Sequence, residues 1–393
     1  MTRTGTGPAV GTGLSGQLVE EAGALDAVRE EWDALAASAG RPYCTPAWML
    51  SWWHAARVGD ARLRVVVVRD GSEVVAIAPF FAQVSRPAGL RLVELRLLGA
   101  GGAHRIGPLC RPGREGEAAQ AITDALAASR PRPSSVVFEG IDVDDPWPRL
   151  LAARWPAPAR AALRRDNEMS APVANLGDGT YEAFFAGRSS KYRAQMRRAR
   201  RSLEADGLEI RRTHAPEQLE RDLEAFVALH EARWAERGGS HALDAGVVAL
   251  LRRVADDLLG SGRFRLWLVE VGGAAIGAGL FVAAGDVVSF WGGGMDPAHK
   301  RASPAQLAIL AGIEECYAQG EHVVDFGGGG LDYKWRFCDT DEPVVWSTVF
   351  PRDARYPLTR LQLAPKHLRY GARNAARRLP PERQQQLRRL LRR

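Results

Sequence analysis

Two stretches of this 393-residue sequence align with each other without a gap: RLRVVVVRDGSEVVAIAPFF at residues 62–81 and RFRLWLVEVGGAAIGAGLFV at residues 263–282. Each reads as a strand, a two-residue turn and a second strand, and the turns are Asp70-Gly71 and Gly272-Gly273. A glycine-containing pair between two apolar runs is the short-range signal of a β-hairpin. The alignment therefore predicts the same hairpin twice. It places Arg62, Arg64, Gly71 and Phe80 opposite Arg263, Arg265, Gly272 and Phe281.

Similar elements follow the hairpin in both copies, in the order strand, helix, strand. A tryptophan-bearing helical stretch also precedes each hairpin, around Trp32 and Trp234. One strand-turn-strand unit can match another by chance, but the shared order of elements favours a duplicated α/β unit. The predicted elements are strands 91–98 and 135–141 around helix 115–129, and strands 286–292 and 322–326 around helix 304–319.

This duplication predicts five parts of the chain. They are a disordered start at 1–14, a first half at 15–165, a linker and basic helix at 166–207, a second half at 208–352 and a basic helical tail at 353–393.

The composition is that of a globular protein, because hydrophobic residues make up 46% and charged residues 25% of the chain. No apolar run approaches the roughly 18 residues that a membrane-spanning helix needs. The glycine-rich first residues lack the apolar region of a secretory signal, so we expect a cytoplasmic protein. The four cysteines are widely scattered and form no C-x-x-C pair. We therefore expect reduced thiols and no metal site.

The net charge of +7 is concentrated at the end of the chain. Residues 366–393 hold ten Lys/Arg and one acid, a net of +9, so the other 365 residues sum to −2 (7 − 9). A second basic segment, at residues 189–207, places Tyr192, Met196, Ala199 and Leu203 on one helical face. Both segments fit solvated helices. Both also fit an anionic partner, either tRNA or a membrane surface with which the protein would make peripheral contact.

A strand followed by a cationic turn and a helix start predicts a phosphate site at residues 300–306. Ser303 precedes Pro304 and stands three residues before Gln306, which is the pattern of a capping box. Helix N–H groups and the helix dipole beside two cations favour a phosphate. An ordinary capped helix that packs its apolar face into the core is the equal alternative. The predicted donor-binding residues are Lys300, Arg301, Ser303, Ala305 and Gln306.

The stretch HVVDFGGGGLDYKWRF, at residues 322–337, gathers polar groups around a glycine turn. A short apolar strand ends near Asp325, and four glycines follow, which allow close approach of the backbone to a ligand. Asp332, Tyr333, Lys334 and Arg336 come directly after them. So many polar groups at a strand end indicate either a functional site or an ion-pair network.

Several motifs carry a family resemblance. They are S-x-K-x-R at 189–193, Leu229-His230 with Arg233-Trp234, Ser303-Pro304, and D-F-G with Y-K-x-R-F at 325–337. Through them the second half resembles the acetyltransferase domain of CelD-type polysaccharide-biosynthesis proteins, relatives of the Fem-type aminoacyl-tRNA-dependent peptidyltransferases. The first half resembles the amino-terminal portion of that family through Trp32, Pro46-Ala47-Trp48 and the hairpin that reaches Pro79. The likeness covers about residues 15–350.

The resemblance implies an α/β (α+β) chain with tandem GNAT-like domains, each a mixed, mostly antiparallel sheet flanked by helices. It also implies a GNAT-type N-acetyltransferase that uses acetyl-CoA or another acyl-CoA, without a metal, and acts on a sugar or cell-envelope precursor. One departure concerns the Q/R-x-x-G-x-G/A phosphate loop of acetyl-CoA-dependent enzymes. Counted from Arg301, its glycine position holds Pro304, which lacks a backbone donor. Another acyl-CoA or an aminoacyl-tRNA therefore stays open as the donor.

Acyl transfer needs a base for the acceptor, donors for the oxyanion and a proton for the leaving group. We assign Asp325 as the base or acceptor-orienting group, Tyr333 as the proton donor and Lys334 as the group that stabilises negative charge. The predicted substrate-binding residues are His230, Arg233, Trp234, Trp291 and Arg336, and His230 is also a weaker base candidate. The alternative from another class is a catalytically idle GNAT-like scaffold that binds a partner.

Overall fold

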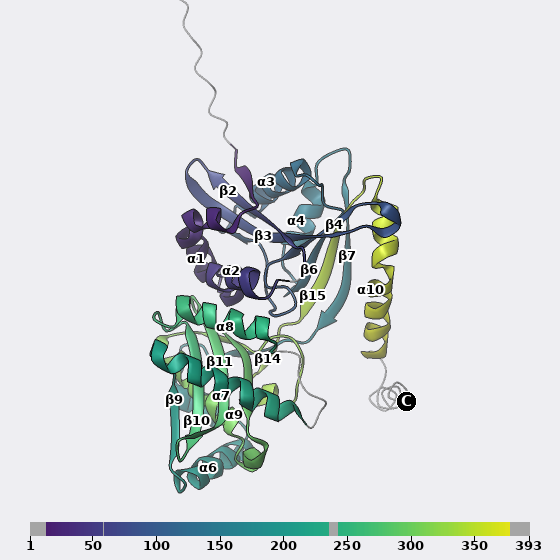
Figure 1. The fold of residues 1–393 in the computed structure, drawn as a ribbon. Coiled ribbons are helices and arrows are strands. Elements are labelled where there is room, and N and C mark those ends of the chain that lie inside the picture. The colour runs from purple at the N-terminus through teal and green to yellow at the C-terminus, as the bar shows by residue number, and fades with distance from the viewer. Residues whose placement is uncertain (1–12, 58, 236–242, 378–393) are drawn as a thin grey trace, which may run out of the picture.

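The computed structural model describes residues 13–57, 59–235 and 243–377, and they form two β-sheets that are stacked end to end in Figure 1. Most of the predicted disordered start at 1–14, and residues 378–393 of the predicted tail, lie outside the described residues. The first sheet contains β1 (Ser15–Val19), β2 (Arg62–Asp70), β3 (Glu73–Ser85), β4 (Leu92–Leu97), β5 (Leu109–Cys110), β6 (Ser135–Asp142), β7 (Ala161–Met169) and β15 (Val344–Pro351). The second contains β8 (Pro172–Asn175), β9 (Leu208–Arg212), β10 (Phe264–Val271), β11 (Ala274–Ala284), β12 (Val287–Met295), β13 (Val323–Asp325) and β14 (Thr340–Asp341).

Helices cover both sheets. Those of the first half are α1 (Arg29–Ser38), α2 (Pro46–Ala55), α3 (Glu115–Ala128) and α4 (Trp147–Arg154). Those that follow are α5 (Tyr181–Gly187), α6 (Ser190–Glu204), α7 (Pro216–Ala235), α8 (Ala245–Leu258), α9 (Pro304–Gln319) and α10 (Tyr356–Arg377). Short 3-10 turns are η1 (Ala22–Val28), η2 (Pro42–Cys44), η3 (Pro87–Gly89), η4 (Pro297–Ala302) and η5 (Lys334–Arg336).

The two sheets have the same strand arrangement. Their orders are β1-β2-β3-β4-β6-β15-β7 and β9-β10-β11-β12-β13-β8-β14, with β5 paired to β3 beside the first path. At equivalent places in the described strands, β4 pairs with β6 and β12 with β13 in parallel, while their other neighbours are antiparallel. The prediction of mixed, mostly antiparallel sheets flanked by helices is confirmed.

The two hairpins also share a β-bulge at the same position. The register of β2 with β3 shifts between Val68 and Arg69, and that of β10 with β11 shifts between Val269 and Glu270. These positions coincide in the gapless alignment of the two sequences. A bulge bends and twists its strand in a defined direction, so its retention indicates a common origin of the halves.

The predicted domain boundaries differ from the structure in two places. Strand β15, assigned from the sequence to the second half, pairs with β6 and β7 of the first sheet. The predicted linker at 166–207 holds the end of β7 as well as β8, which pairs with β13 of the second sheet. Residues 172–341 are thus inserted between two strands of the first sheet. The apolar pattern of β15 fits the core of either sheet, so the sequence does not select between them.

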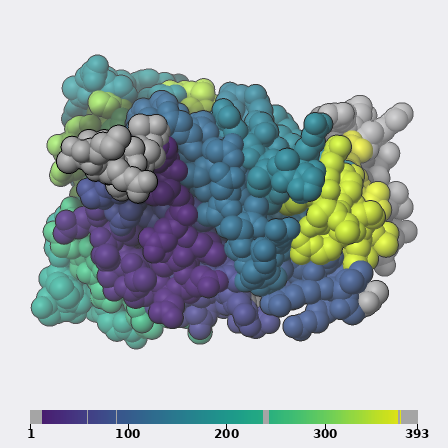
Figure 2. Space-filling model, turned by 90° about the horizontal axis from the view of Figure 1, so that it is seen from above, coloured from purple at the N-terminus to yellow at the C-terminus, as the bar shows by residue number. Residues whose placement is uncertain are grey.

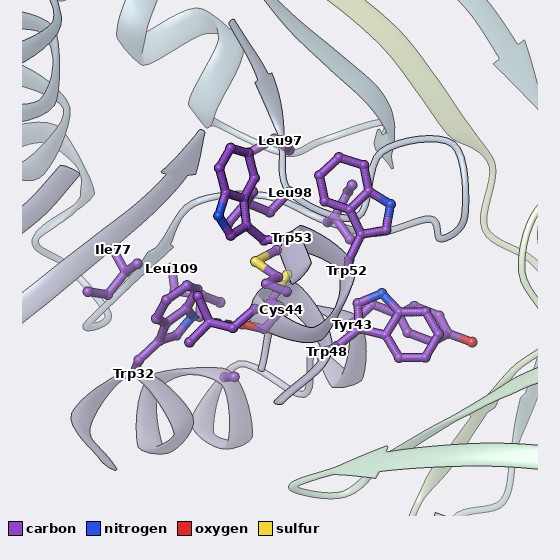
Figure 3. Close-up of a cluster of buried hydrophobic side chains, with 14 of the residues drawn as sticks. Trp32, Tyr43, Cys44, Trp48, Trp52, Trp53, Ile77, Leu97, Leu98 and Leu109 are labelled. Atoms are coloured by element: carbon purple, nitrogen blue, oxygen red, sulfur yellow. Dashed lines mark hydrogen bonds between the residues drawn. The ribbon is translucent and has the colours of Figure 1, made fainter. Parts of the chain in front are cut away.

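Aromatic residues fill the core of the first half around α2 (Figure 3). This helix begins at Pro46, and the Thr45 hydroxyl caps it by accepting the amide N–H of Trp48 at 3.3 Å. The Trp32 indole donates to the Cys44 carbonyl oxygen at 2.8 Å, which ties α1 to η2. Burial of such large rings dominates the stability of a core.

The halves share this core. Helix α8 of the second half packs against α2, and Leu250, Leu251 and Phe264 belong to the same buried cluster as Trp48. Two ion pairs cross the junction at the surface, Arg29 with Asp257 and Arg263 with Asp33. Because one apolar cluster continues across the junction, the relative position of the halves is set by packing.

The described part of the predicted basic tail is the docked helix α10. It runs along β7 on the outside of the first half (Figure 1), and it stands on the molecular surface in the view of Figure 2. The His367 ring lies 2.7 Å from Asp166 of β7, and the Lys366 ammonium lies 3.3 Å from Glu139. On its outer side Leu361 is 69% exposed and Leu368 is 72% exposed.

Candidate functional site

Strands β12 and β13 separate from each other and leave a wedge in the second sheet. They pair in parallel only from Val287 to Ser289, opposite 323–325. Strand β12 then continues to Met295, whereas the chain turns away after Asp325. We call this opening the β12–β13 wedge. Among the described strands, none pairs with β12 beyond Ser289 on this side, so its edge there lacks a strand partner.

A bulge changes the direction of β12 at the mouth of the wedge. Leu280 pairs with Gly292 and Phe281 pairs with Phe290, which leaves Trp291 as the extra residue. The Trp291 ring packs against Phe226 of α7 with centroids 6.1 Å apart, so it lines the α7 side. Bulges often re-aim side chains next to active sites.

Helix α7 approaches β12 closely because the strand carries glycines at 292–294. A Cβ atom at Gly294 would lie 2.5 Å from the backbone nitrogen of His230, which no side chain tolerates. The apolar face of α7 is buried against the sheet, with Phe226 fully buried. The glycines thus bring the last turns of α7 to the wedge.

The end of α7 presents a polar and aromatic group to the 331–336 turn. The Arg233 guanidinium lies 5.2 Å from the centre of the Tyr333 ring and 5.7 Å from that of Trp234, and it donates to the Gly293 carbonyl at 3.3 Å. Burial raises the pKa of Tyr333, and Arg233 opposes this shift. Burial, together with Arg233, lowers the pKa of His230. At neutral pH the site therefore contains a protonated phenol and a neutral imidazole, a proton donor and a proton acceptor.

The predicted donor loop lies at the same end of the sheet, but it lacks the predicted capping box. Ser303 adopts a left-handed conformation with φ of 50°, and its hydroxyl does not cap α9. It accepts instead from the Gln195 amide of α6 at 3.4 Å. The Gln306 side-chain oxygen accepts from Arg336 at 3.2 Å. The capping-box pattern failed because η4 ends in the left-handed turn that leads into α9.

Lys300 and Arg301 are exposed on this loop. They lie in η4 directly before α9, whose first turn carries no acidic residue. The equivalent helix of the first half, α3, has Glu115 and Glu117 in its first turn. Acidic side chains at a helix N-terminus occupy the place that an anion would take. Arg114 directly precedes α3, but it is paired with Asp70 and Glu117. Of these two helices, α9 is thus the one that begins beside exposed cations without acids in its first turn.

Lys334 is buried and holds the glycine turn together. Its ammonium donates to the carbonyl oxygens of Phe326, Gly327 and Gly328 at 2.7, 3.0 and 3.1 Å. Burial lowers its pKa to about 8, although the charge of Asp325 opposes this. All three N–H donors are thus used by the backbone. This geometry assigns Lys334 to positioning of the turn, and leaves no donor for the charge of a reacting group.

Asp325 is also buried, and residues of both halves surround it. Its carboxylate accepts the amide N–H of Gly327 at 2.9 Å and lies 3.3 Å from the Arg105 guanidinium. Burial and the charge of Asp325 raise the pKa of the nearby Tyr43 hydroxyl. The Asp325 carboxylate is thus already engaged by a backbone amide and a guanidinium group beneath the glycine turn.

Two residues of the first half that we did not predict as site residues reach the glycine turn. His104 Nδ1 accepts the amide N–H of Gly328 at 3.1 Å, and Arg105 binds Asp325 and also Asp142 of its own half. Arg105 has φ of 56°, and its amide donates to the Gly140 carbonyl at 2.6 Å. The glycine-rich sequence GAGGAHRIG at 99–107 was the signal for a special loop, but no sequence feature indicates contact with the other half.

The structure therefore brings together most predicted residues in two neighbouring groups. One group contains His230, Arg233, Trp234, Trp291 and Tyr333, and the other contains Lys300, Arg301, Ser303, Ala305, Gln306 and Arg336. Arg336, predicted to bind the acceptor, lies with the donor loop. Asp325 and Lys334 lie beneath the wedge and support the turn.

The thiols of the described cysteines are buried or half-buried. Burial raises the pKa of the Cys44 thiol to about 11 and that of Cys110 to about 12. In the three described ranges, no group of three or more His, Cys, Asp or Glu side chains could hold a metal ion. The helices of those ranges also include none that is long and apolar enough to cross a membrane.

Comparisons with known proteins agree with this architecture. Residues 190–335 match the model of the family described as acetyltransferase (GNAT) domain. No curated protein matches the sequence.

Solved structures show the same fold over both halves. FemX has a TM-score of 0.61 at 12% identity, over 85% of this chain and 98% of FemX. The C-terminal DUF2156 domain of a protein described as a lysylphosphatidylglycerol synthetase from Agrobacterium fabrum has a TM-score of 0.53 at 11% identity, over 86% and 95%. L-PGS from Bacillus licheniformis has a TM-score of 0.50 at 12% identity, over 86% and 96%. The chain thus has a tandem GNAT-like fold, and residues 190–335 of its second half resemble an acetyltransferase (GNAT) domain.

Proposed function

We propose that the second half is a GNAT-type N-acyltransferase that moves an acyl group from acyl-CoA to an amine or hydroxyl of a sugar or cell-envelope precursor, and acetyl is the acyl group that we expect. One observation carries the proposal. The unpaired edge of β12 meets a cationic helix start on one side and a neutral base with a neutral acid on the other. Acyl transfer needs this combination of groups.

The chemistry follows from the two groups of residues. The acceptor nitrogen or oxygen attacks the thioester carbon while His230 takes its proton. Backbone N–H groups on the free edge of β12 donate to the oxyanion. The carbon–sulfur bond then breaks, and Tyr333 gives its proton to the leaving thiolate. Arg233 stabilises the tyrosinate that forms, because its guanidinium already contacts that side chain.

The donor phosphates are assigned to Lys300 and Arg301 with the start of α9. In acetyl-CoA-dependent enzymes the equivalent position is a glycine that provides a backbone N–H donor, and Pro304 lacks this donor. We expect the two exposed cations to compensate, since charged contacts to phosphate are strong. Donor binding should then be more sensitive to salt than in a site made of backbone amides.

Aminoacyl transfer from aminoacyl-tRNA is the second candidate. Helix α6 carries six Lys/Arg and one Glu, a net of +5, and its Gln195 side chain bonds to Ser303 of the donor loop. A basic helix beside the donor site suits a longer polyanion than CoA. The fold likeness to FemX favours the same candidate, given the resemblance of the sequence to Fem-type enzymes.

The test is transfer of radiolabel from acetyl-CoA, from a panel of acyl-CoAs and from charged tRNA to a panel of amino sugars and their nucleotide-linked forms. Transfer from acyl-CoA that resists ribonuclease supports the first candidate, and transfer only from charged tRNA supports the second. A folded protein that transfers from neither donor would be an idle scaffold, and both candidates would be rejected.

A further inference from the structure

A cavity lies in the second half, between α5, α6, α9 and the strands β9 and β10. Its volume is about 390 Å³, within the range of pockets that hold small ligands. Trp267 on β10 belongs to the α9 side of the sheet, because Leu266 and Leu268 face the core shared with α8. The acyl-transfer groups of α7 lie on that other face, so this cavity is separate from them. It shares α6 and α9 with the donor loop, but none of the predicted donor-binding residues lines it.

The floor of the cavity is apolar. Met196 comes from α6, Ile210 from β9, and Leu307 with Leu310 from α9. Phe185 of α5 closes one side, and Trp267 closes the other. These side chains present apolar surface in a cavity that is open to solvent, so an apolar group that binds there removes this surface from water.

The rim of the cavity is cationic. Arg197 and Arg200 of α6 both line it and are exposed. Arg197 lies 5.9 Å from the centre of the Phe185 ring, and Arg200 pairs with Glu204 at 3.2 Å. Both contacts are at the surface and are worth little, so both guanidinium groups can turn to a ligand. Glu314 is the one acid among the lining residues.

We propose that this cavity binds the hydrocarbon chain of a single-chain amphiphilic anion, with its carboxylate or phosphate head at Arg197 and Arg200. The apolar floor accepts the chain, whereas a fully polar anion would leave it empty. The two guanidinium groups bind an anionic head, and the net charge of +5 on α6 draws it to the rim. This site is independent of the acyl-transfer proposal, because its readout is binding alone.

Fluorescence titration with dansylaminoundecanoic acid, below its micelle concentration, tests the proposal on the full chain. The probe should brighten and saturate at one site per chain. Leu310→Trp fills the floor and should weaken binding by about tenfold or more. Leu361→Trp is its control, since Leu361 is exposed on α10. If Leu310→Trp fails to fold, Ala311→Leu narrows the same cavity with a smaller change.

The rim is tested with charge reversals on one helix. Arg197→Glu with Arg200→Glu should weaken binding of the acid but not of its uncharged methyl ester. Arg198→Glu with Arg201→Glu changes the helix charge equally at positions that do not line the cavity, and binding should persist.

Two results would overturn the proposal. One is equal loss of binding in both charge-reversal variants, which would mean that the probe follows the general charge of α6. The other is unchanged binding in both Leu310→Trp and Ala311→Leu. Binding to phosphatidylglycerol vesicles distinguishes a free amphiphile from one that is part of a bilayer. If the vesicles bind wild type and Leu310→Trp equally, and the monomeric probe does not bind, the protein adsorbs to the membrane surface. That result would contradict a chain-binding cavity.

Discussion

The Arg105 guanidinium of the first half lies 3.3 Å from the Asp325 carboxylate of the second, directly beneath the turn that faces the wedge. Both side chains are well buried, at 13% and 2% exposed. The first half therefore supports the site of the second half through a charge pair. The first half thus has a structural role at the site of the second half.

Removal of one partner of this pair should destabilise the whole chain. We expect Arg105→Met to lower the free energy of unfolding by about 3–5 kcal/mol, because a buried carboxylate is left without its cation. Asp325→Asn should be nearly as harmful, and the double variant should recover part of the loss. Urea unfolding of the three variants measures this coupling, and additive losses would mean that the pair is not coupled.

The same variant separates a structural from a catalytic Asp325. A lost general base costs about 10²–10⁴-fold in rate. We expect the folded fraction of Asp325→Asn to lose less activity than this, that is, less than about 10²-fold, since the carboxylate is already ion-paired. Full stability with a large loss of kcat would restore Asp325 as the base.

Lys334 should make the free energy of unfolding of the chain vary with pH in the alkaline range. Its folded pKa of about 8 lies below the usual value of 10.5. Between those values the unfolded chain holds a proton that the folded chain has released, so stability rises with pH. Relative to Lys334→Met, the wild type should therefore gain free energy of unfolding from about pH 8 to about pH 10. Denaturant midpoints at several pH values measure the difference, and a constant difference would contradict the lowered pKa.

His230 and Tyr333 should act on the rate of transfer. We expect His230→Asn and Tyr333→Phe each to lower kcat by about 10²–10⁴-fold, with little change in melting temperature. Because burial lowers the pKa of His230, activity should be flat at neutral pH and fall only below about pH 6.5. Trp335→Ala, an exposed position in the same turn, is the matched control. Near-normal kcat in both variants would place the base and the acid elsewhere.

The docking of α10 should weaken in acid. His367 is buried beside Asp166 with Arg164 and Arg360 nearby, and burial lowers its pKa despite the carboxylate. A released helix binds a proton near pH 6.5 while the docked helix does not, so docking loses free energy as pH falls. Hydrogen exchange of α10 should accelerate between about pH 7 and about pH 5 after correction for the intrinsic rate. His367→Gln should lose this dependence; if it keeps the dependence, another group is responsible.

The sequence predicted those helices whose residue pattern repeats over a few neighbouring positions. Helix 304–319 and the buried face of α6, including Tyr192 and Met196, are as expected. Both depend on neighbours a few residues apart. The exchange of strands between the halves was missed because pairing partners such as β6 and β15 are about two hundred residues apart, and no local feature selects them.

The structure groups several of the predicted site residues at one surface, and it places others in buried positions that the sequence did not indicate. The grouping of Arg233 with Tyr333 followed from the family motifs. The reach of Arg105 to Asp325 depends on the packing of two domains, which leaves no periodic pattern in either sequence. Burial converts Lys334 from a reactive cation into a support for backbone carbonyls.

Calorimetry with acetyl-CoA tests most directly the claim that one donor site lies in the second half. The account predicts one site per chain, lost in Lys300→Ala with Arg301→Ala and retained in Arg111→Ala with Arg114→Ala of the first half. Two equivalent sites per chain, or one site that survives loss of Lys300 and Arg301, would contradict it.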